Sequence, residues 1–231
     1  VLTIAIIIPA TLLLIFGFRA KSESEPLTSL PCNLEQIIEK GELNVVVDYN
    51  SINYFTYKGV PMGFQYEMLS ALAAEMGVEL KITVNNNLNE ALNDLNNGVY
   101  DIFAKNFFVT KDRAEEIEFT EPVMFSRQVL VQRSKSSRGA AADSLFIGTL
   151  FSLAQKTVVV RQNGVFAPRL ESLSDEIGAP IHVVEDSIND VEQLIEMVSK
   201  GLINYTVSDE NLAKVNTRLY RNLDISMPVS F

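Results

Sequence analysis

Segments with helical and strand periodicity alternate along most of this chain. Apolar residues repeat at helical spacing from Phe64 to Met76, end at Gly77, and then occupy every second position from Leu80 to Val84. The same criteria predict strands at 43–47, 100–104, 157–160, 181–184 and 205–207, and helices at 88–95, 165–177, 188–200 and 209–216. This order favours an α/β fold with a largely parallel sheet and flanking helices.

Two further patterns bear on the organisation of the chain. A β-rich segment at 123–132 precedes a polar run at 133–138 and small residues at 139–142, which we interpret as a crossing into a second lobe. Ser187 and Asp190 have the spacing of a capping box and predict where the helix at 188–200 begins.

The N-terminal residues form an uncharged apolar run from Val1 to Phe18. A helix of this length would span about 27 Å, nearly a bilayer core. Residues 1–20 are therefore expected to be a transmembrane anchor or a signal segment, and residues 21–33 a linker. A buried core helix is the weaker alternative, because the run is apolar on every face. Pro31 precedes Cys32 where a small residue would be needed for lipidation, so we do not expect a lipoprotein.

Composition excludes several functional classes. The net charge of −10 argues against binding to nucleic acid. One cysteine and one histidine cannot build a zinc site of the usual kind, and no phosphate-binding or dinucleotide motif is present, so neither a metal nor a cofactor is expected. An enzyme would need a positioned acid in a cleft. The candidates are ordinary carboxylates that surface solvation also explains: Glu67, Glu115, Glu118 and Glu121.

The segment DIFAKNFFVTKDRAEEIEFTEP, Asp101 to Pro122, resembles the type 2 periplasmic solute-binding proteins, also called extracellular solute-binding protein family 3. The resemblance implies a two-lobed α/β fold with hinge strands. It also implies that Arg113, with Thr110 beside it, clamps a ligand carboxylate. A planar guanidinium can make two charge-assisted hydrogen bonds to a carboxylate. The alternatives are a surface arginine paired with Glu116 and a threonine that only caps a helix.

The segment GLINYTVSDENLAKV, Gly201 to Val215, resembles the strand of the second lobe that ends in an aspartate binding a ligand ammonium. The resemblance therefore implies that Asp209 binds a ligand ammonium, although a helix N-cap would explain an aspartate there equally well. The resemblance puts a second-lobe ligand loop at Arg161–Val165, without the usual hydroxyl residue. Tyr54, Phe55 and Phe107 are candidates for stacking on the ligand, with core or rim packing as the alternative.

Within this family, PMGFQYEML, NLNEALNDLNNG and LDISMPVSF resemble the sensor-like domain of membrane-bound lytic murein transglycosylase F. The resemblance implies lobe 1 at 34–124, lobe 2 at 125–223 and a return hinge strand at 224–231, without the C-terminal part of lobe 1. Asn106 and Phe108 depart from ordinary amino-acid carriers. We include Phe108 in the candidate site as a bulky wall that suits a larger ligand, such as a peptide fragment.

The expected function is therefore binding without catalysis. The expected partners are a small amino acid or peptide ligand, the membrane through residues 1–20, and a transporter or murein hydrolase, at a periplasmic location. The alternatives are the substrate-binding component of an amino-acid transporter, a fragment of a lytic transglycosylase, and an interaction domain with a degenerate cleft.

Overall fold

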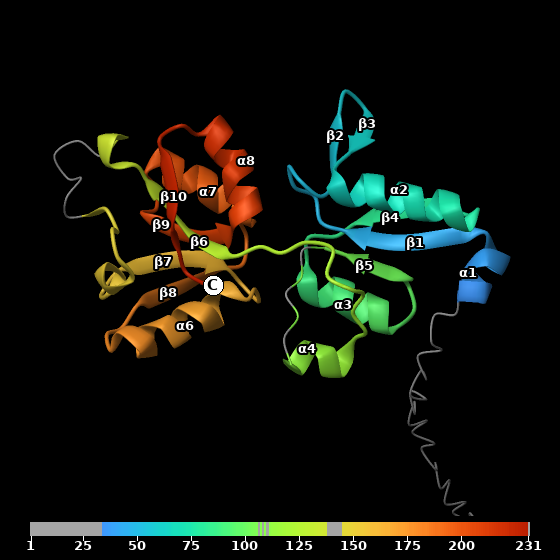
Figure 1. Cartoon of the computed structure of the whole chain (residues 1–231), viewed down its shortest axis with the longest axis horizontal. Helices are drawn as coiled ribbons and strands as arrows, with labels where there is room; N and C mark the ends of the chain where they lie inside the picture. Colours follow the sequence, from blue (N-terminus) through green and yellow to red (C-terminus); the bar gives the residue numbers. More distant parts are fainter. Residues whose placement is uncertain (1–33, 106, 108, 110, 138–144, 231) are drawn as a thin grey trace, which may run out of the picture.

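The computed structural model describes residues 34–105, 107, 109, 111–137 and 145–230. These residues form two bodies, and a single extended segment connects them (Figure 1). The predicted anchor and linker, Cys32, Phe108 and Thr110 lie outside the described residues.

The first body is built around a parallel sheet of strand order β4-β1-β5. In register, Val45 of β1 lies opposite Ile82 of β4 and Ile102 of β5. Figure 1 shows α2 and α3 on opposite sides of this sheet, and the β2–β3 hairpin projecting beyond it. The elements are α1 (Leu34–Lys40), β1 (Glu42–Val47), β2 (Phe55–Tyr57), β3 (Val60–Met62), α2 (Phe64–Met76), β4 (Glu79–Val84), α3 (Leu88–Asn96), β5 (Ile102–Ala104) and α4 (Lys111–Glu116).

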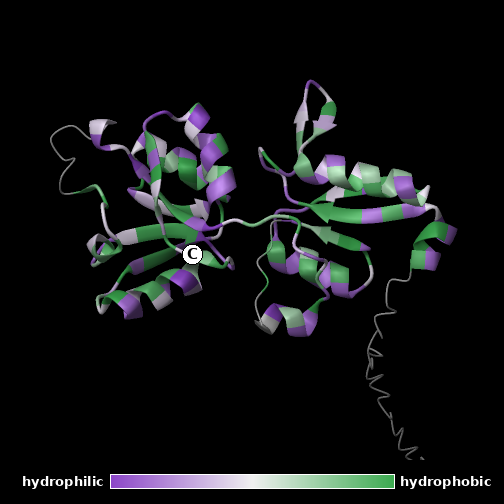
Figure 2. Ribbon diagram, in the orientation of Figure 1, coloured by the Kyte–Doolittle hydropathy of each residue, from purple (hydrophilic) through white to green (hydrophobic). Residues whose placement is uncertain are grey.

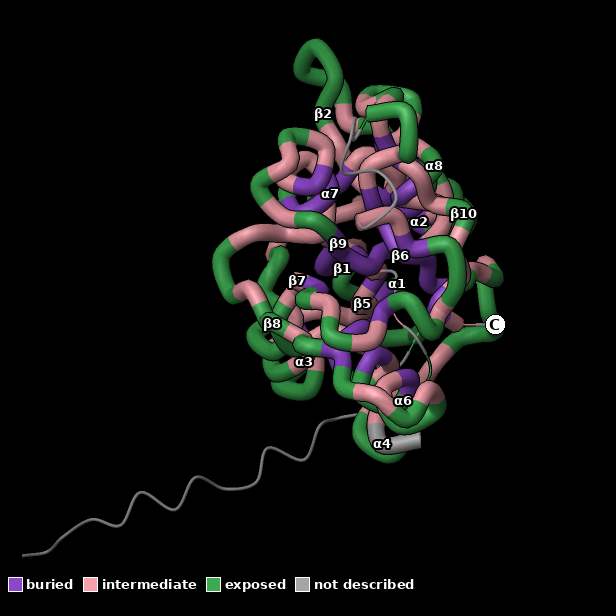
Figure 3. Tube along the Cα trace, turned by 90° about the vertical axis from the view of Figure 1, so that its left-hand side faces the viewer, coloured by how far each residue is buried: buried purple, intermediate pink, exposed green. Residues whose placement is uncertain are grey.

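The central strand β1 supplies the core of the first body. Val45, Val46 and Val47 have no exposed surface, because a parallel strand with helices on both faces is buried on both faces. Leu69 and Ala73 of α2 pack onto the same cluster. Buried positions accordingly concentrate in the strands near the centre of the molecule (Figure 3).

Helix α2 has the bounds that its periodicity predicts. The helix ends because Gly77 adopts the left-handed conformation, with φ of 69°, and donates its N–H to the carbonyls of Ala73 and Ala74. Glycine reaches this conformation without the steric cost that a Cβ would add.

The second body contains two sheets. Strand β6 lies between β10 and β9 and is antiparallel to both, whereas β7 and β8 pair in parallel. The largely parallel arrangement predicted for the whole chain is therefore wrong here, because β10 runs back along β6, the strand by which the chain enters. The elements are β6 (Gln128–Arg133), η1 (Lys135–Ser137), η3 (Leu150–Leu153), β7 (Thr157–Arg161), α6 (Phe166–Ile177), β8 (His182–Asp186), α7 (Val191–Lys200), β9 (Tyr205–Asp209), α8 (Glu210–Leu219) and β10 (Leu223–Pro228).

Several predicted boundaries differ from the structure, and two of the differences have a local cause. The β-rich segment at 123–132 is a strand only from Gln128, because residues 123–127 have no partner strand. These residues connect the two bodies, and Phe125 among them is 89% exposed. Helix α7 begins at Val191, and its capping box joins Asp190 to Gln193. Ser187 does not cap the helix, because the preceding Asp186 already accepts hydrogen bonds from the backbone N–H groups of residues 188 and 189.

Apolar residues dominate the strands, and the helices carry mixed apolar and polar positions (Figure 2). This is the pattern of amphipathic helices that cover a sheet. Among the helices that the structure describes, none has the length and apolar character required to cross a membrane. Strand β10 pairs with β6 within the second body, and the return hinge strand expected at 224–231 stays a prediction.

Candidate functional site

A cleft of about 190 Å³ lies between the two bodies and is lined by residues of both. From the first body come residues that follow β1 and β5, and from the second come residues at the end of β7 and the start of α7. The carboxyl ends of parallel strands are where α/β sheets usually place ligands. The cleft is therefore the candidate binding site.

Arg113 of α4 lines this cleft. Its guanidinium carbon lies 3.9 Å from the centroid of the Phe107 ring, in cation–π contact. The Phe107 ring in turn stacks on Phe119 at 6.0 Å and meets Phe103 edge-on at 5.1 Å. Burial lowers the pKa of Arg113 from its usual value. The aromatic cluster thus supports a half-buried cation at the wall of the cleft.

Asp209 lines the cleft from the second body, at the end of β9. It is 9% exposed, and its Oδ1 accepts hydrogen bonds from the Ser126 hydroxyl at 2.7 Å and from the Asn211 backbone N–H at 2.9 Å. The second bond makes it the N-cap of α8. The helix-cap role is therefore present, and the side chain also reaches the cleft.

Asp48 follows β1 and is held by two amides at the rim of the cleft. Its carboxylate accepts hydrogen bonds from Asn50 Nδ2 at 2.6 Å and from Asn53 Nδ2 at 3.0 Å. Burial raises the pKa of Asp48, and these hydrogen bonds oppose that effect. The loop after β1 is thereby fixed against the cleft.

Lys105 and Arg161 bring further positive charge to the cleft from opposite bodies. Lys105 comes directly after β5, and Arg161 is the last residue of β7. The sequence placed Arg161 in a ligand loop but gave no role to Lys105 or Asp48. The signal that would have found them is their position at the carboxyl end of a buried strand.

A set of hydrogen bonds joins the two bodies across the mouth of the cleft. Glu192 of α7 accepts hydrogen bonds from the hydroxyl and the backbone N–H of Ser51, which belongs to the first body. Asn216 of α8 donates its Nδ2 to the same carboxylate at 2.9 Å. We call the contact of Ser51 with Glu192 the latch, because it holds the bodies together.

Replacing Ser51 with Ala removes the hydroxyl bond of the latch and should favour the open form. A hydrogen bond to a charged group contributes about 1.5–3 kcal/mol, so the ratio of closed to open molecules should fall by about 10-fold to 150-fold. Small-angle scattering of the unliganded chain should report a larger radius of gyration. Ser70→Ala, which changes a hydroxyl on α2 away from the latch, is the control. An unchanged radius for Ser51→Ala would show that the latch does not set the conformation.

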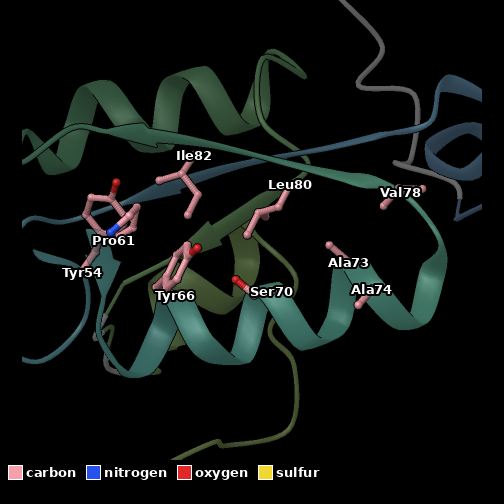
Figure 4. A pocket seen from close by; sticks show the side chains of 9 residues that line it. All are labelled: Tyr54, Pro61, Tyr66, Ser70, Ala73, Ala74, Val78, Leu80 and Ile82. Atoms are coloured by element: carbon pink, nitrogen blue, oxygen red, sulfur yellow. The ribbon is translucent and has the colours of Figure 1, made fainter. Parts of the chain in front are cut away.

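The predicted aromatic residues divide between two places. Phe107 lines the cleft, whereas Tyr54 and Phe55 are not among the residues that line it. Tyr54 instead lines a groove of about 410 Å³ on the first body, between α2 and β4. Figure 4 shows its ring beside those of Pro61 and Tyr66. Phe55 is half-buried in β2.

The alternative catalytic residues do not gather at the cleft. The candidate glutamates are all exposed and none of them lines it: Glu67, Glu115, Glu118 and Glu121. In the described part of the chain, no three histidine, cysteine or carboxylate side chains are grouped so as to hold a metal ion. The chemistry available in the cleft is that of charged hydrogen bonds and aromatic contacts.

Comparison with known proteins agrees with this geometry. Residues 43–224 match the bacterial extracellular solute-binding proteins, family 3. The membrane-bound lytic murein transglycosylase F of Desulfosudis oleivorans is 32% identical over 197 residues, which are 85% of this chain and 41% of the relative. The protein of the same name from Saccharophagus degradans is 28% identical over 201 residues, 87% of this chain and 38% of the relative. The chain thus spans about two fifths of these relatives.

Solved structures show the same fold. A mutant of ArgBP from T. maritima superposes with a TM-score of 0.68 at 22% identity, covering 84% of this chain and 79% of that one. An ancestral amino acid-binding protein, described as a precursor of cyclohexadienyl dehydratase, superposes with a TM-score of 0.67 at 21% identity. The match covers 84% of this chain and 82% of that one. The matching family is one of binding proteins, so this chain is a binding domain and not itself an enzyme. The chain belongs to the bacterial extracellular solute-binding proteins of family 3.

Proposed function

We propose that this chain is an extracytoplasmic solute-binding or sensor domain that captures a small carboxylate-bearing ligand between its two lobes. The observation that carries the proposal is the placement of Arg113 and Asp209 on opposite walls of one cleft. The Arg113 guanidinium would bind the ligand carboxylate by two parallel hydrogen bonds. In the described part of the chain, both hydrogen bonds to Asp209 fall on Oδ1, which leaves Oδ2 to accept from a ligand ammonium.

The size of the cleft favours a small ligand. Its volume of about 190 Å³ is below the roughly 300–1,000 Å³ usual for sites that enclose drug-sized ligands. An amino acid or a very short peptide suits this space better than a long peptidoglycan fragment. Phe107 would pack against the ligand beside Arg113, whereas Thr110 and Phe108 keep their predicted roles as ligand contacts outside the described residues.

Movement of the lobes would accompany capture. The chain crosses between the bodies in residues 123–127, and β10 leads back toward the crossing (Figure 1). We assign this crossing as the hinge, because residues 123–127 have no partner strand and carry the chain from one body to the other. The latch between Ser51 and Glu192 would then favour the closed form once a ligand fills the cleft.

The similar proteins support two candidates for the output of binding. Curated relatives are named membrane-bound lytic murein transglycosylase F, which supports a sensor that regulates a transglycosylase in the same protein or nearby. The likeness to a solved structure described as an amino acid ABC transporter substrate-binding protein favours the second candidate, the binding component of an amino-acid transporter. A domain that only interacts with other proteins would not need the charged residues that converge on the cleft.

The carboxylate requirement is tested by thermal unfolding of the full chain in mild detergent, with a panel of free amino acids and short peptides and their C-terminal amides. A ligand present at 100 times its Kd stabilises the folded state by about 2.7 kcal/mol, so an acid that binds should raise the Tm clearly. The matching amide should not. Equal shifts for acids and amides, or no shift with any member, would contradict the proposal.

Residues 1–20 are proposed to attach the domain to the periplasmic face of the membrane. They include 18 residues without a charge, close to the roughly 20 that a spanning helix requires. We expect the full chain to sediment with membranes after cell lysis and a variant that lacks residues 1–20 to stay in the supernatant. Sedimentation of the shortened variant with membranes would show that another segment makes the attachment.

A further inference from the structure

Lys105 and Arg161 face one cleft from opposite lobes. Each stands at the carboxyl end of a strand that pairs in parallel, β5 in the first lobe and β7 in the second. Both side chains are half-buried, so their charges are only partly screened by water. Arg161 is the last residue of β7, and Lys105 directly follows β5, so both are positioned by the ends of the sheets.

Neutral groups hold these two cations in place. Lys105 donates to the backbone carbonyl of Asn85, and its Nζ lies 5.1 Å from the centroid of the Phe103 ring. Arg161 donates from Nη1 to the backbone carbonyl of Asn189 at 2.9 Å. The ion pairs found in the described ranges involve other lysines and arginines. Both cations can therefore accept an anionic partner in the cleft.

The carboxylates of the cleft are already engaged with donors of the protein. Asp48 accepts from two amides, and Asp209 from a hydroxyl and a backbone N–H. Asp190 accepts from the backbone N–H of Gln193, and Glu192 accepts from Ser51 and Asn216. Each of these carboxylates therefore already has a donor from the protein, whereas the hydrogen bonds of Lys105 and Arg161 within the described residues go to backbone carbonyls.

Lys105 and Arg161 would repel each other as the empty cleft closes, and Asp48 would offset part of this repulsion. Burial lowers the pKa of Lys105; the charge of Asp48 opposes this shift, and the charge of Arg161 adds to it by less. An anion between the two side chains would replace their repulsion with two attractions, one to each lobe. Such an anion would stabilise the closed form directly.

We propose that Lys105 and Arg161 form a second anion subsite that bridges the lobes, so that the ligand carries two anionic groups, one of them the carboxylate assigned to Arg113. The inference rests on the proposed function and narrows the ligand to the acidic class: a dicarboxylic amino acid or a short peptide with an acidic side chain.

Paired probes test the second anionic group. L-glutamate and L-glutamine have nearly the same shape and differ in one carboxylate, and so do the dipeptides Ala-Glu and Ala-Gln. Calorimetry on the full chain in mild detergent should give at least tenfold tighter binding for the acid of a pair, which corresponds to about 1.4 kcal/mol. Arg161→Gln and Lys105→Gln should each reduce the preference to less than threefold. Arg218→Gln, which changes an exposed arginine of α8, should leave it unchanged.

The possible results separate this inference from the proposed function. Equal binding of acid and amide side chains, or tighter binding of L-arginine or L-lysine than of L-glutamate, would overturn the second subsite and leave the single carboxylate clamp standing. A preference that survives in both Arg161→Gln and Lys105→Gln would overturn the assignment of the residues. If no acid of either pair binds, the second subsite fails, and the proposed function stands or falls on its own panel of acids and amides. Thermal unfolding of each variant verifies that it is folded.

Discussion

Replacing Arg113 with Ala should weaken binding of the carboxylate ligand by about 30-fold to several thousand-fold. The guanidinium lies against Phe107 at the wall of the cleft, and burial lowers its pKa, so a ligand carboxylate there would be shielded from water. Removing one partner of a desolvated charge pair costs about 2–5 kcal/mol, and about 1.4 kcal/mol corresponds to each tenfold change in Kd. Calorimetry with an acid that binds the wild-type chain gives the ratio of the Kd of the variant to that of the wild type.

Two comparisons sharpen this test. Arg113→Lys should recover only part of the affinity, because an ammonium supplies a point charge where the guanidinium supplies two parallel hydrogen bonds and a flat face for Phe107. If Arg113 acts only as a surface residue paired with Glu116, its removal would cost about 0.5 kcal/mol and leave binding intact. A loss of less than threefold, at an unchanged Tm, would remove Arg113 from the site.

Replacing Gly63 with Ala should lower the free energy of unfolding by about 2–6 kcal/mol. Gly63 has φ of 129° and ψ of 161°, a region that other residues almost never occupy. A Cβ at this position would lie 2.4 Å from the carbonyl oxygen of Asn53, which accepts hydrogen bonds from the backbone N–H groups of Gln65 and Tyr66. Backbone strain and steric overlap each contribute about 1–3 kcal/mol. Urea unfolding measures the change.

Gly77→Ala is the matched control for this experiment. Gly77 also has a positive φ, 69°, but a Cβ there would meet no atom within 4 Å. Its replacement should cost only about 1–2 kcal/mol of left-handed strain. If Gly63→Ala costs no more than Gly77→Ala, the close approach of Asn53 to the start of α2 does not contribute to stability.

Elements with strong local signals were predictable from the sequence. The bounds of α2 follow from its apolar repeat and from Gly77, and both signals lie within the helix or next to it. The start of α7 was not predictable in the same way. Two acidic residues compete there for backbone amides, and Asp186 engages those of residues 188 and 189 before Asp190 caps the helix.

The antiparallel pairing of β6 could not be read from periodicity, because buried parallel and antiparallel strands have similar apolar runs. The residues of the cleft were also only partly predictable from the sequence. Arg113 and Asp209 were candidates through the family resemblance, whereas Lys105 and Asp48 were missed. Their roles depend on which strand ends meet across the two lobes, and that information is in the topology. Tyr54 looked equally suited to the cleft and instead lines the groove on α2.

Mass spectrometry of the small molecules that co-purify with the chain from a bacterial envelope tests the central claim most directly. The wild-type chain and the Arg113→Ala variant should be purified in parallel and denatured to release what they hold. The account predicts a molecule of amino-acid or short-peptide size, with at least one carboxylate, that is retained by the wild type and lost from the variant. A bound molecule without a carboxylate, or one that both proteins retain equally, would contradict the claim that Arg113 anchors an acidic ligand between the lobes.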